Sequence, residues 1–214
     1  MDLSSAELAE LAGWAYALIF LISAGDAVFP VLPGETSVIL GGVLAAQGDL
    51  SVWLVFLAGA TGALVGDNVS YQIGSFANRR GKRPEQMRGR LGTALGWAEA
   101  ALESRGPSMI VMARFIPGGR TALTFGAGYL GYRRGVFMGS TLLAGVVWAG
   151  YATTIGYIGG EIFHEKWWAG LALGLALSFA VTAVIEVIRK KRGNAVSIAE
   201  KRAELRERRG RVAD

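Results

Sequence analysis

Arg114-Phe115-Ile116-Pro117-Gly118-Gly119-Arg120 lies in the middle of an apolar stretch, 109–130, and divides it into two short pieces. Neither piece approaches the roughly 20 apolar residues that a membrane-spanning helix needs. Proline interrupts the helical hydrogen-bond pattern, and adjacent glycines allow the backbone to turn sharply. The stretch therefore predicts that the chain reverses inside the membrane, in a hairpin over about 107–131, instead of crossing it.

A second broken segment lies earlier in the chain, at about 29–47. It begins Phe29-Pro30-Val31-Leu32-Pro33-Gly34-Glu35, with Phe, Pro, Gly and a charge in the same order as in 114–120. The apolar part that follows is too short to span a membrane. A shift of about 85 positions sets Glu35 on Arg120 and Gly74 on Gly159, which suggests an internal repeat.

Longer apolar stretches predict spanning helices. The chain has 214 residues, of which 52% are hydrophobic, enough for one domain of four to six membrane segments. The four expected spans are Leu11–Val28, Val52–Ile73, Val136–Ile158 and Trp167–Ile188.

Basic residues indicate the orientation of these segments. Of the 22 Lys and Arg residues, seven lie in 75–107, ten lie from Arg189 onward, and two adjoin at 133–134. Cytoplasmic loops are enriched in Lys and Arg, so these regions and the C-terminus are expected inside, and the Glu161–Lys166 loop outside. The 29–47 segment then opens only to the outer face, and 107–131 only to the inner face.

Two half-spanning hairpins of opposite orientation, each followed by a full helix, are typical of alternating-access carriers. We therefore expect an all-α polytopic membrane protein, an inverted repeat of two re-entrant hairpins each followed by a transmembrane helix, plus flanking helices. Residues 1–190 form the transmembrane domain and 191–214 a basic cytoplasmic tail. The cytoplasmic loop 75–107 contains a short helix pattern at Thr93–Ser104.

Composition argues against several kinds of chemistry. The chain has no Cys and one His, His164, so thiol catalysis, disulfides and His-rich or thiolate metal sites lack their residues. We expect no metal, no cofactor and no enzymatic activity, because no acid–base pair adjoins the arginines. Topology and anionic lipid explain the net charge of +5, and nucleic-acid binding is not expected.

Five charged residues fall within or beside apolar segments: Asp26, Glu35, Asp67, Arg114 and Arg120. An unpaired charge at the bilayer centre costs roughly 2.5–3.5 kcal/mol on insertion scales, so each of them needs a partner or a cavity. If the two hairpin tips meet near the midplane, Glu35 and Asp26 approach the two arginines. The non-helical backbone at the tips is then buried in protein, as a membrane requires.

The two arginines flank the Pro117-Gly118-Gly119 turn and suit a phosphate. Each guanidinium offers a planar fork of donors, and the helix that starts after the turn directs its dipole toward an anion. A neighbouring carboxylate that is protonated in one state and ion-paired in another would provide a route to proton coupling. The competing interpretation is a structural ion-pair lock between the hairpins, and the two can coexist.

Asp67 lies in Gly66-Asp67-Asn68-Val69-Ser70-Tyr71-Gln72-Ile73-Gly74, a polar part of an apolar helix. Asp67 and Tyr71 line a cavity or make hydrogen bonds between closely packed helices, and we favour the second interpretation. Trp148 is interpreted as an interfacial anchor or as packing.

These motifs together resemble the DedA membrane proteins, the bacterial branch of the SNARE-associated Golgi, or VTT, superfamily. The resemblance covers roughly residues 10–190, and the arginine hairpin is its specific part. It is carried by Pro33-Gly34-Glu35 with Asp26 upstream, Gly66-Asp67 with Tyr71 and Gly74 downstream, and 114–120 followed by Ala127-Gly128 and Trp148.

The resemblance implies lipid transport in the bacterial inner membrane. Family members are implicated in returning undecaprenyl or decaprenyl phosphate to the cytoplasmic leaflet, in phospholipid scrambling and in proton-motive-force homeostasis. Arg114 and Arg120 would bind the substrate phosphate, and Glu35 and Asp26 would couple protons or act as a gate. Asp26 is shorter than the Glu that many members carry at this position.

Three other functions remain open. They are a phospholipid scramblase or flippase, a proton-dependent small-ion or drug transporter, and an intramembrane lipid phosphatase, which lacks a His nucleophile. The expected partners are polyprenyl phosphate or phospholipid and the surrounding membrane lipids. The sequence leaves open a homodimer and whether Leu11–Val28 spans fully.

Overall fold

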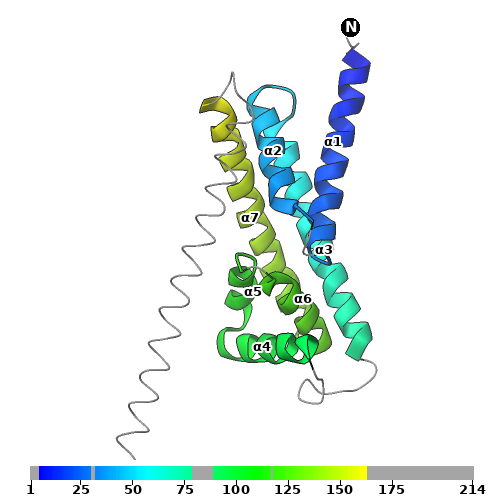
Figure 1. Cartoon of the computed structure of the whole chain (residues 1–214), viewed down its shortest axis with the longest axis vertical. Helices are drawn as coiled ribbons and strands as arrows, with labels where there is room; N and C mark the ends of the chain where they lie inside the picture. The colour runs from blue at the N-terminus through cyan, green and yellow to red at the C-terminus, as the bar shows by residue number, and fades with distance from the viewer. Residues whose placement is uncertain (1–4, 30–31, 79–88, 117, 163–214) are drawn as a thin grey trace, which may run out of the picture. The chain divides into compact units, whose positions relative to one another are not determined.

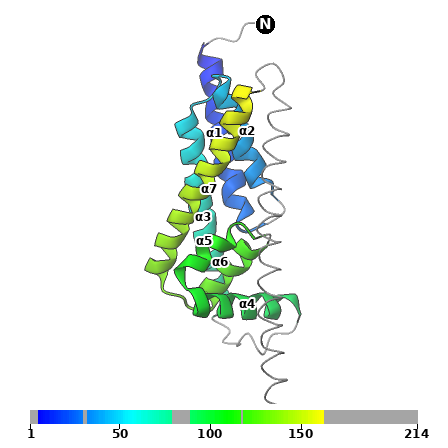
Figure 2. The ribbon, with the colours of Figure 1, turned by 90° about the vertical axis from the view of Figure 1, so that its left-hand side faces the viewer.

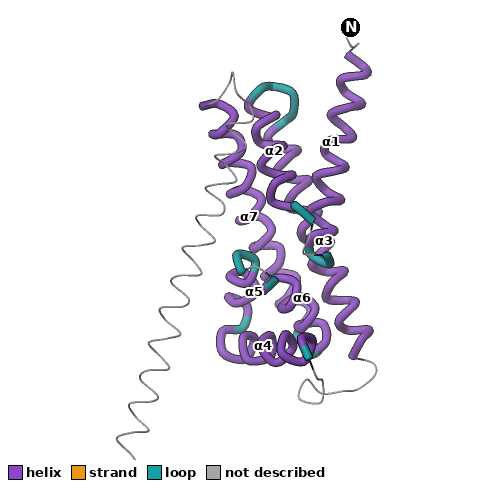
Figure 3. Tube along the Cα trace, in the orientation of Figure 1, coloured by secondary structure: helices purple, strands orange, loops and turns teal. Residues whose placement is uncertain are grey.

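The structure, a computed structural model, describes residues 5–29, 32–78, 89–116 and 118–162, all within one compact unit of the chain. In these ranges every regular element is a helix and no strand occurs, as expected (Figure 3). The expected span Trp167–Ile188, His164 and the basic tail lie outside the described residues. The helices are α1 (Ser5–Asp26), α2 (Gly34–Ala46), α3 (Val52–Asn78), α4 (Arg90–Arg105), α5 (Pro107–Ala113), α6 (Gly119–Tyr129) and α7 (Arg134–Ile162).

Two of the described helices, α3 and α7, are long and apolar enough to cross a membrane. They contain 27 and 29 residues and include the expected spans 52–73 and 136–158. Large apolar side chains remain exposed along both helices, among them Leu57 and Val65 on α3 and Leu142 and Val146 on α7. Such faces are unfavourable in water and favourable against lipid tails.

Helix α1 does not run the full length of its neighbour α3. It packs on the first part of α3, where a side chain at Gly62 or Gly66 would collide with the backbone of Phe20 or Ala24. The Tyr16 hydroxyl accepts a hydrogen bond from the backbone N–H of Ser51, just before α3 begins. As Figure 1 shows, α1 ends beside the middle of α3. By length and composition, only α3 and α7 among the described helices meet the criterion for a span, so whether Leu11–Val28 spans fully stays open.

The chain reverses between Asp26 and Gly34, and α2 returns beside α1 (Figure 1). Residues 34–46 form one continuous helix, so the two arms of the first hairpin are α1 and α2, and not two halves of 29–47. The physical reason is the position of Pro33, which precedes the first turn and ends any helix before it, whereas the glycines inside α2 remain helical.

Two short helices with a turn between them occupy the range of about 107–131, where the sequence predicted the second hairpin. Helix α5 leads into a turn, Gly118 adopts a left-handed φ of 69°, and α6 begins at Gly119. The helix expected at Thr93–Ser104 is present as α4, which lies crosswise to the long helices and packs on α5 and α6 (Figures 1 and 2). Leu95 and Ala98 form its buried face.

Each short helix packs along the long helix of the other half of the chain. Helix α2 lies against the second part of α7, and a β-carbon at Gly156 would collide with the carbonyl of Ile39. Helix α6 lies against the second part of α3, and a β-carbon at Gly128 would collide with the carbonyl of Tyr71. Close approach of two helix backbones requires small residues of this kind. Both hairpin turns thereby come to lie beside the middle of the long helices (Figure 3).

Candidate functional site

Two arginines share one carboxylate where the hairpin turns meet. The Asp67 Oδ1 atom accepts a hydrogen bond from Arg120 Nε at 2.7 Å, and its Oδ2 atom accepts one from Arg114 Nη1, also at 2.7 Å. Arg120 Nη1 donates to Asp26 Oδ2 at 3.0 Å. We call Asp26, Asp67, Arg114 and Arg120 the ion-pair cluster.

The ion-pair cluster is mostly buried. The Asp67 and Arg114 side chains are 1% and 2% exposed, Arg120 is 10% exposed, and Asp26 is 24% exposed. Buried charges are tolerated only when they are paired and hydrogen-bonded, and removing one partner of such a pair typically costs about 3–5 kcal/mol. Of the four side chains, Asp26 has the largest exposed fraction.

Parallel packing of α3 and α6 brings Arg120 to Asp67. Arg120 lies in the first turn of α6, and one turn later the Thr124 hydroxyl lies 3.0 Å from the Ser70 hydroxyl of α3. Thr124 also donates to the Arg120 carbonyl. Arg120 Nη2 reaches the carbonyl of Ala63 at 3.4 Å, so all three nitrogens of this guanidinium have partners. Each nitrogen of Arg120 thus donates one hydrogen bond to a protein group.

Arg114 is held differently, by the aromatic side chains of α7. Its guanidinium carbon lies 5.1 Å from the ring centroid of Trp148, within cation–π range. The adjacent Phe115 meets Tyr151 edge to face, with ring centroids 6.3 Å apart. Arg114 Nε and Nη2 are buried, and neither has a hydrogen-bond partner among the described residues. These two nitrogens form the side of the guanidinium that binds an oxyanion with two parallel hydrogen bonds.

Glu35 lies at the start of α2, beside the ion-pair cluster. A β-carbon at the preceding Gly34 would come within 3.0 Å of the Asp26 side chain, so the first turn of α2 approaches that carboxylate closely. The half-buried Glu35 contributes to the electrostatic field at Asp26, as do Arg120, Arg114 and Asp67. Three acidic and two basic side chains are thus gathered around the two turns.

The structure brings together Asp26, Arg114 and Arg120, which the sequence predicted to meet. Asp67 makes a hydrogen bond between helices, as expected, but its partners Arg114 and Arg120 were not predicted. The signal was its position, since Asp67 is the acidic residue within the 27-residue apolar helix α3. Pairing with Arg114 and Arg120 offsets the cost of burying that charge.

The remaining predicted residues shape or support the turns. The Tyr71 hydroxyl donates to the carbonyl of Tyr132 at 2.6 Å, and its ring lies against Phe137, so Tyr71 ties α3 to the start of α7. Pro33 and Gly34 begin α2, and Gly118 and Gly119 begin α6. Pro117 lies outside the described residues.

Trp148 has a more specific place than the sequence indicated. It was interpreted as an interfacial anchor or as packing, and it is a buried core residue, 6% exposed, under the Arg114 guanidinium. A tryptophan in an apolar helix gives no sign of which face it occupies, so this contact could not be predicted from the sequence alone.

Comparison with known proteins identifies relatives of this chain. The VTT domain model matches residues 32–158. The protein DedA of Escherichia coli K12 is 33% identical over 205 residues, which cover 91% of this chain and 92% of that protein. An uncharacterised membrane protein of Mycobacterium leprae is 30% identical over 147 residues, covering 68% of this chain and 65% of that protein. The inner membrane protein YohD of E. coli K12 is 33% identical over 161 residues, covering 69% of this chain and 80% of that protein.

Long apolar helices with exposed apolar faces, together with relatives that are named membrane proteins, indicate a helical membrane protein. Within that class, the chain belongs to the DedA family of VTT-domain membrane proteins. No solved structure matches the chain.

Proposed function

We propose that this protein is a carrier that returns a polyprenyl phosphate, such as undecaprenyl or decaprenyl phosphate, to the cytoplasmic leaflet of the bacterial inner membrane. Arg114 and Arg120 bind the phosphate while the prenyl chain stays in lipid. The protein moves its substrate without changing it chemically, so it acts as a carrier and not as an enzyme.

One observation carries this proposal above a purely structural ion-pair lock. Arg114 is 2% exposed, yet its Nε and Nη2 atoms lack partners among the described residues. Buried donors without acceptors cost free energy, about 1–3 kcal/mol for a neutral group and more for a charged one. A ligand with two adjacent oxygen acceptors, such as a phosphate, would satisfy both donors at once.

The depth of the site fits a lipid headgroup on its way across. Asp67 lies a little past the middle of α3, whose 27 residues exceed the roughly 20 needed to cross the hydrocarbon core. This position along α3 supports a cluster near the midplane, where an anion needs compensating charges to pass. Because α3 and α7 each expose apolar side chains, lipid tails can lie against both helices.

The carrier mechanism rests on an inverted repeat of two re-entrant hairpins, α1–α2 and α5–α6, that open to opposite sides. Reciprocal packing supports this repeat. Val43 adjoins Gly160, and Ser75 adjoins Gly128, two contacts that the shift of about 85 positions exchanges. Such repeats alternate access by rocking one half against the other around a fixed site. The positive-inside bias then places the 75–107 loop and the C-terminus in the cytoplasm.

Proton coupling follows from counting charges. Asp26, Glu35 and Asp67 already outnumber Arg114 and Arg120, so an incoming phosphate adds negative charge to a site with an excess of acids. Low-dielectric surroundings make that excess costly unless a carboxylate takes up a proton. Asp26, the most exposed of the ion-paired carboxylates, and Glu35 at the start of α2 are the groups we assign to proton exchange or gating.

A phospholipid scramblase would use the same phosphate chemistry, so the test compares substrates. The full-length protein is reconstituted in phosphatidylcholine vesicles with labelled geranylgeranyl phosphate or labelled phosphatidylglycerol, with and without a proton gradient. We expect geranylgeranyl phosphate to cross faster than phosphatidylglycerol and the gradient to change its rate. Equal, gradient-independent rates for both lipids would support scrambling, and rates equal to those of protein-free vesicles would contradict both functions.

A further inference from the structure

Asp67 is not one of the residues assigned to phosphate binding or proton exchange, although it lies at the centre of the ion-pair cluster. Its two oxygens accept separate hydrogen bonds, one from each arginine, at the same distance of 2.7 Å. With a side chain 1% exposed, it is the most buried carboxylate of the ion-pair cluster. A carboxylate that bridges two guanidinium groups presents two oxygens to them, as a phosphate would.

We infer that Asp67 is an internal substitute for the substrate phosphate: it occupies the two arginines in the empty carrier, and the phosphate displaces it. This inference rests on the proposed function and adds a residue to it. In the empty carrier the arrangement gives the buried Arg114 an ion-pair partner and Arg120 a second carboxylate beside Asp26, and an unpaired buried arginine would be strongly destabilising. It also makes binding an exchange of one anionic partner of the arginines for another, and the carboxylate set free adds to the excess of acids that proton uptake offsets.

The contacts of the two arginines indicate the order of exchange. Arg120 makes three hydrogen bonds, one from each nitrogen, to Asp67, Asp26 and the Ala63 carbonyl, so it is the more firmly held of the two arginines. Arg114 uses Nη1 on Asp67 and retains Nε and Nη2. The phosphate therefore binds first to the two nitrogens of Arg114 that lack a partner among the described residues, and the Arg114–Asp67 ion pair breaks next.

The surroundings of Arg114 suit such a separation. Arg114 contacts Trp148 of α7, and its neighbour Phe115 contacts Tyr151 of the same helix. Asp67 and Arg120, in contrast, belong to the packed pair α3 and α6. The Arg114–Asp67 ion pair thus joins the α7 side of the protein to the α3 side. Breaking it when substrate binds would remove one tie between α3 and α7, which also pack directly on each other, and would thereby couple binding to the change in access.

The test measures equilibrium binding of labelled geranylgeranyl phosphate to full-length protein in phosphatidylcholine nanodiscs. Geranylgeraniol, which lacks the phosphate, serves as the negative control. Asp67→Asn and Asp67→Ser remove the competing charge, and we expect each to bind at least roughly tenfold more tightly than the wild type, with slower translocation in vesicles. Asp67→Glu keeps the charge and should bind no more tightly than the wild type.

Folded Asp67→Asn or Asp67→Ser with wild-type or weaker affinity would overturn the inference. A wild type that translocates the lipid, beside neutral variants that bind no better, would leave the proposed function standing and refute the role of Asp67. Tight binding by the neutral variants, together with no translocation by the wild type, would support the role of Asp67 and refute the proposed transport function.

A second measurement uses the wild type and does not depend on the variants folding. Dicyclohexylcarbodiimide modifies carboxylic acids in apolar surroundings, and mass spectrometry locates the modified residue. We expect saturating geranylgeranyl phosphate to increase modification of Asp67, because displacement frees its carboxyl group, while the exposed Asp49 reacts to the same extent with and without lipid. Modification of Asp67 that does not change with the lipid would count against displacement.

Discussion

The guanidinium carbon of Arg114 lies 5.1 Å from the centroid of the Trp148 ring. Both side chains are buried, and a cation–π contact in desolvated surroundings contributes about 2 kcal/mol. The aromatic face thus orients Arg114 so that Nη1 donates to Asp67, while Nε and Nη2 have no hydrogen-bond partner among the described residues. An aromatic residue of α7 thereby takes part in a site whose charged residues come from the other helices.

Replacing this aromatic face should weaken phosphate binding. We expect Trp148→Leu to reduce the affinity for geranylgeranyl phosphate by roughly tenfold or more, since about 1.4 kcal/mol corresponds to a factor of ten. Trp148→Phe, which keeps a weaker aromatic face, should lose less. Trp53→Leu is the matched control, because Trp53 is 72% exposed at the start of α3. Equal affinities of Trp148→Leu and Trp53→Leu would show that the ring does not position Arg114.

The fork geometry of Arg120 can be tested without changing its charge. Arg120→Lys keeps one positive charge but cannot reach Asp67, Asp26 and the Ala63 carbonyl together. We expect prenyl-phosphate translocation in vesicles to fall by at least about tenfold, because each charge-assisted hydrogen bond contributes roughly 1.5–3 kcal/mol. The control is Arg134→Lys, at an exposed position where α7 begins. Translocation by Arg120→Lys at the wild-type rate would contradict the proposed role of Arg120.

Close packing between the two halves predicts a sharp difference between two glycines. A β-carbon at Gly128 would collide with the Tyr71 carbonyl, whereas one at Gly139 would meet nothing within 4 Å. Overpacking typically costs about 1–3 kcal/mol, and each kcal/mol lowers a melting temperature by roughly 2–4 °C in a chain of this size. Gly128→Ala should therefore melt several degrees lower in detergent and Gly139→Ala at the wild-type temperature. Similar melting temperatures for the two variants would argue against backbone contact between α3 and α6.

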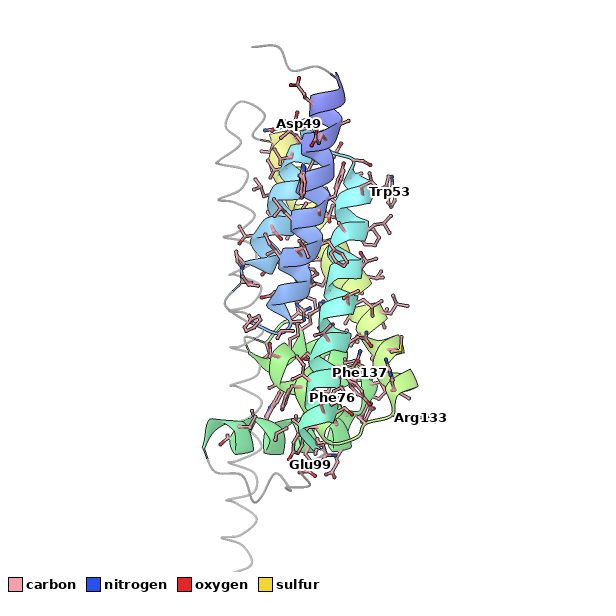
Figure 4. All side chains as sticks on the ribbon, turned by 90° about the vertical axis from the view of Figure 1, so that its right-hand side faces the viewer. Asp49, Trp53, Phe76, Glu99, Arg133 and Phe137 are labelled. Carbon is pink, nitrogen blue, oxygen red and sulfur yellow. The ribbon has the colours of Figure 1, made fainter. Side chains whose placement is uncertain are left out.

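The proposed orientation is accessible to labelling, since the chain has no Cys of its own. Asp49 lies at one end of the helices, and Glu99 and Arg133 lie at the other end (Figure 4). We expect a membrane-impermeant maleimide to label Asp49→Cys in intact spheroplasts, and Glu99→Cys or Arg133→Cys only after the membrane is opened. The opposite pattern would invert the orientation, and labelling of all three from outside would contradict a membrane-crossing α3.

Local chemistry explains why part of this architecture could be predicted from the sequence. The sequence Pro117-Gly118-Gly119 favours a break between two helices, whatever the rest of the fold. The cost of burying the charges of Asp26, Arg114 and Arg120 requires that these side chains have partners. Both consequences follow from residues close in sequence or from charge alone. The helical fold of the described residues and the convergence of these three side chains were therefore predictable.

Packing decided what the sequence could not show. Where α1 packs along α3 depends on Gly62 and Gly66, which lie against the backbone of α1. The central place of Asp67 depends on the register between α3 and α6, which the Ser70–Thr124 contact reflects. A helical pattern defines which residues share a face but not which helix that face meets.

An experimental structure with geranylgeranyl phosphate bound, determined in nanodiscs, tests the central claim most directly. The account predicts phosphate oxygens within hydrogen-bond distance of Arg114 Nε and Nη2, the prenyl chain in lipid between the helices, and Asp67 withdrawn from Arg114. A phosphate bound elsewhere, with Arg114 and Arg120 both still held by Asp67, would contradict it.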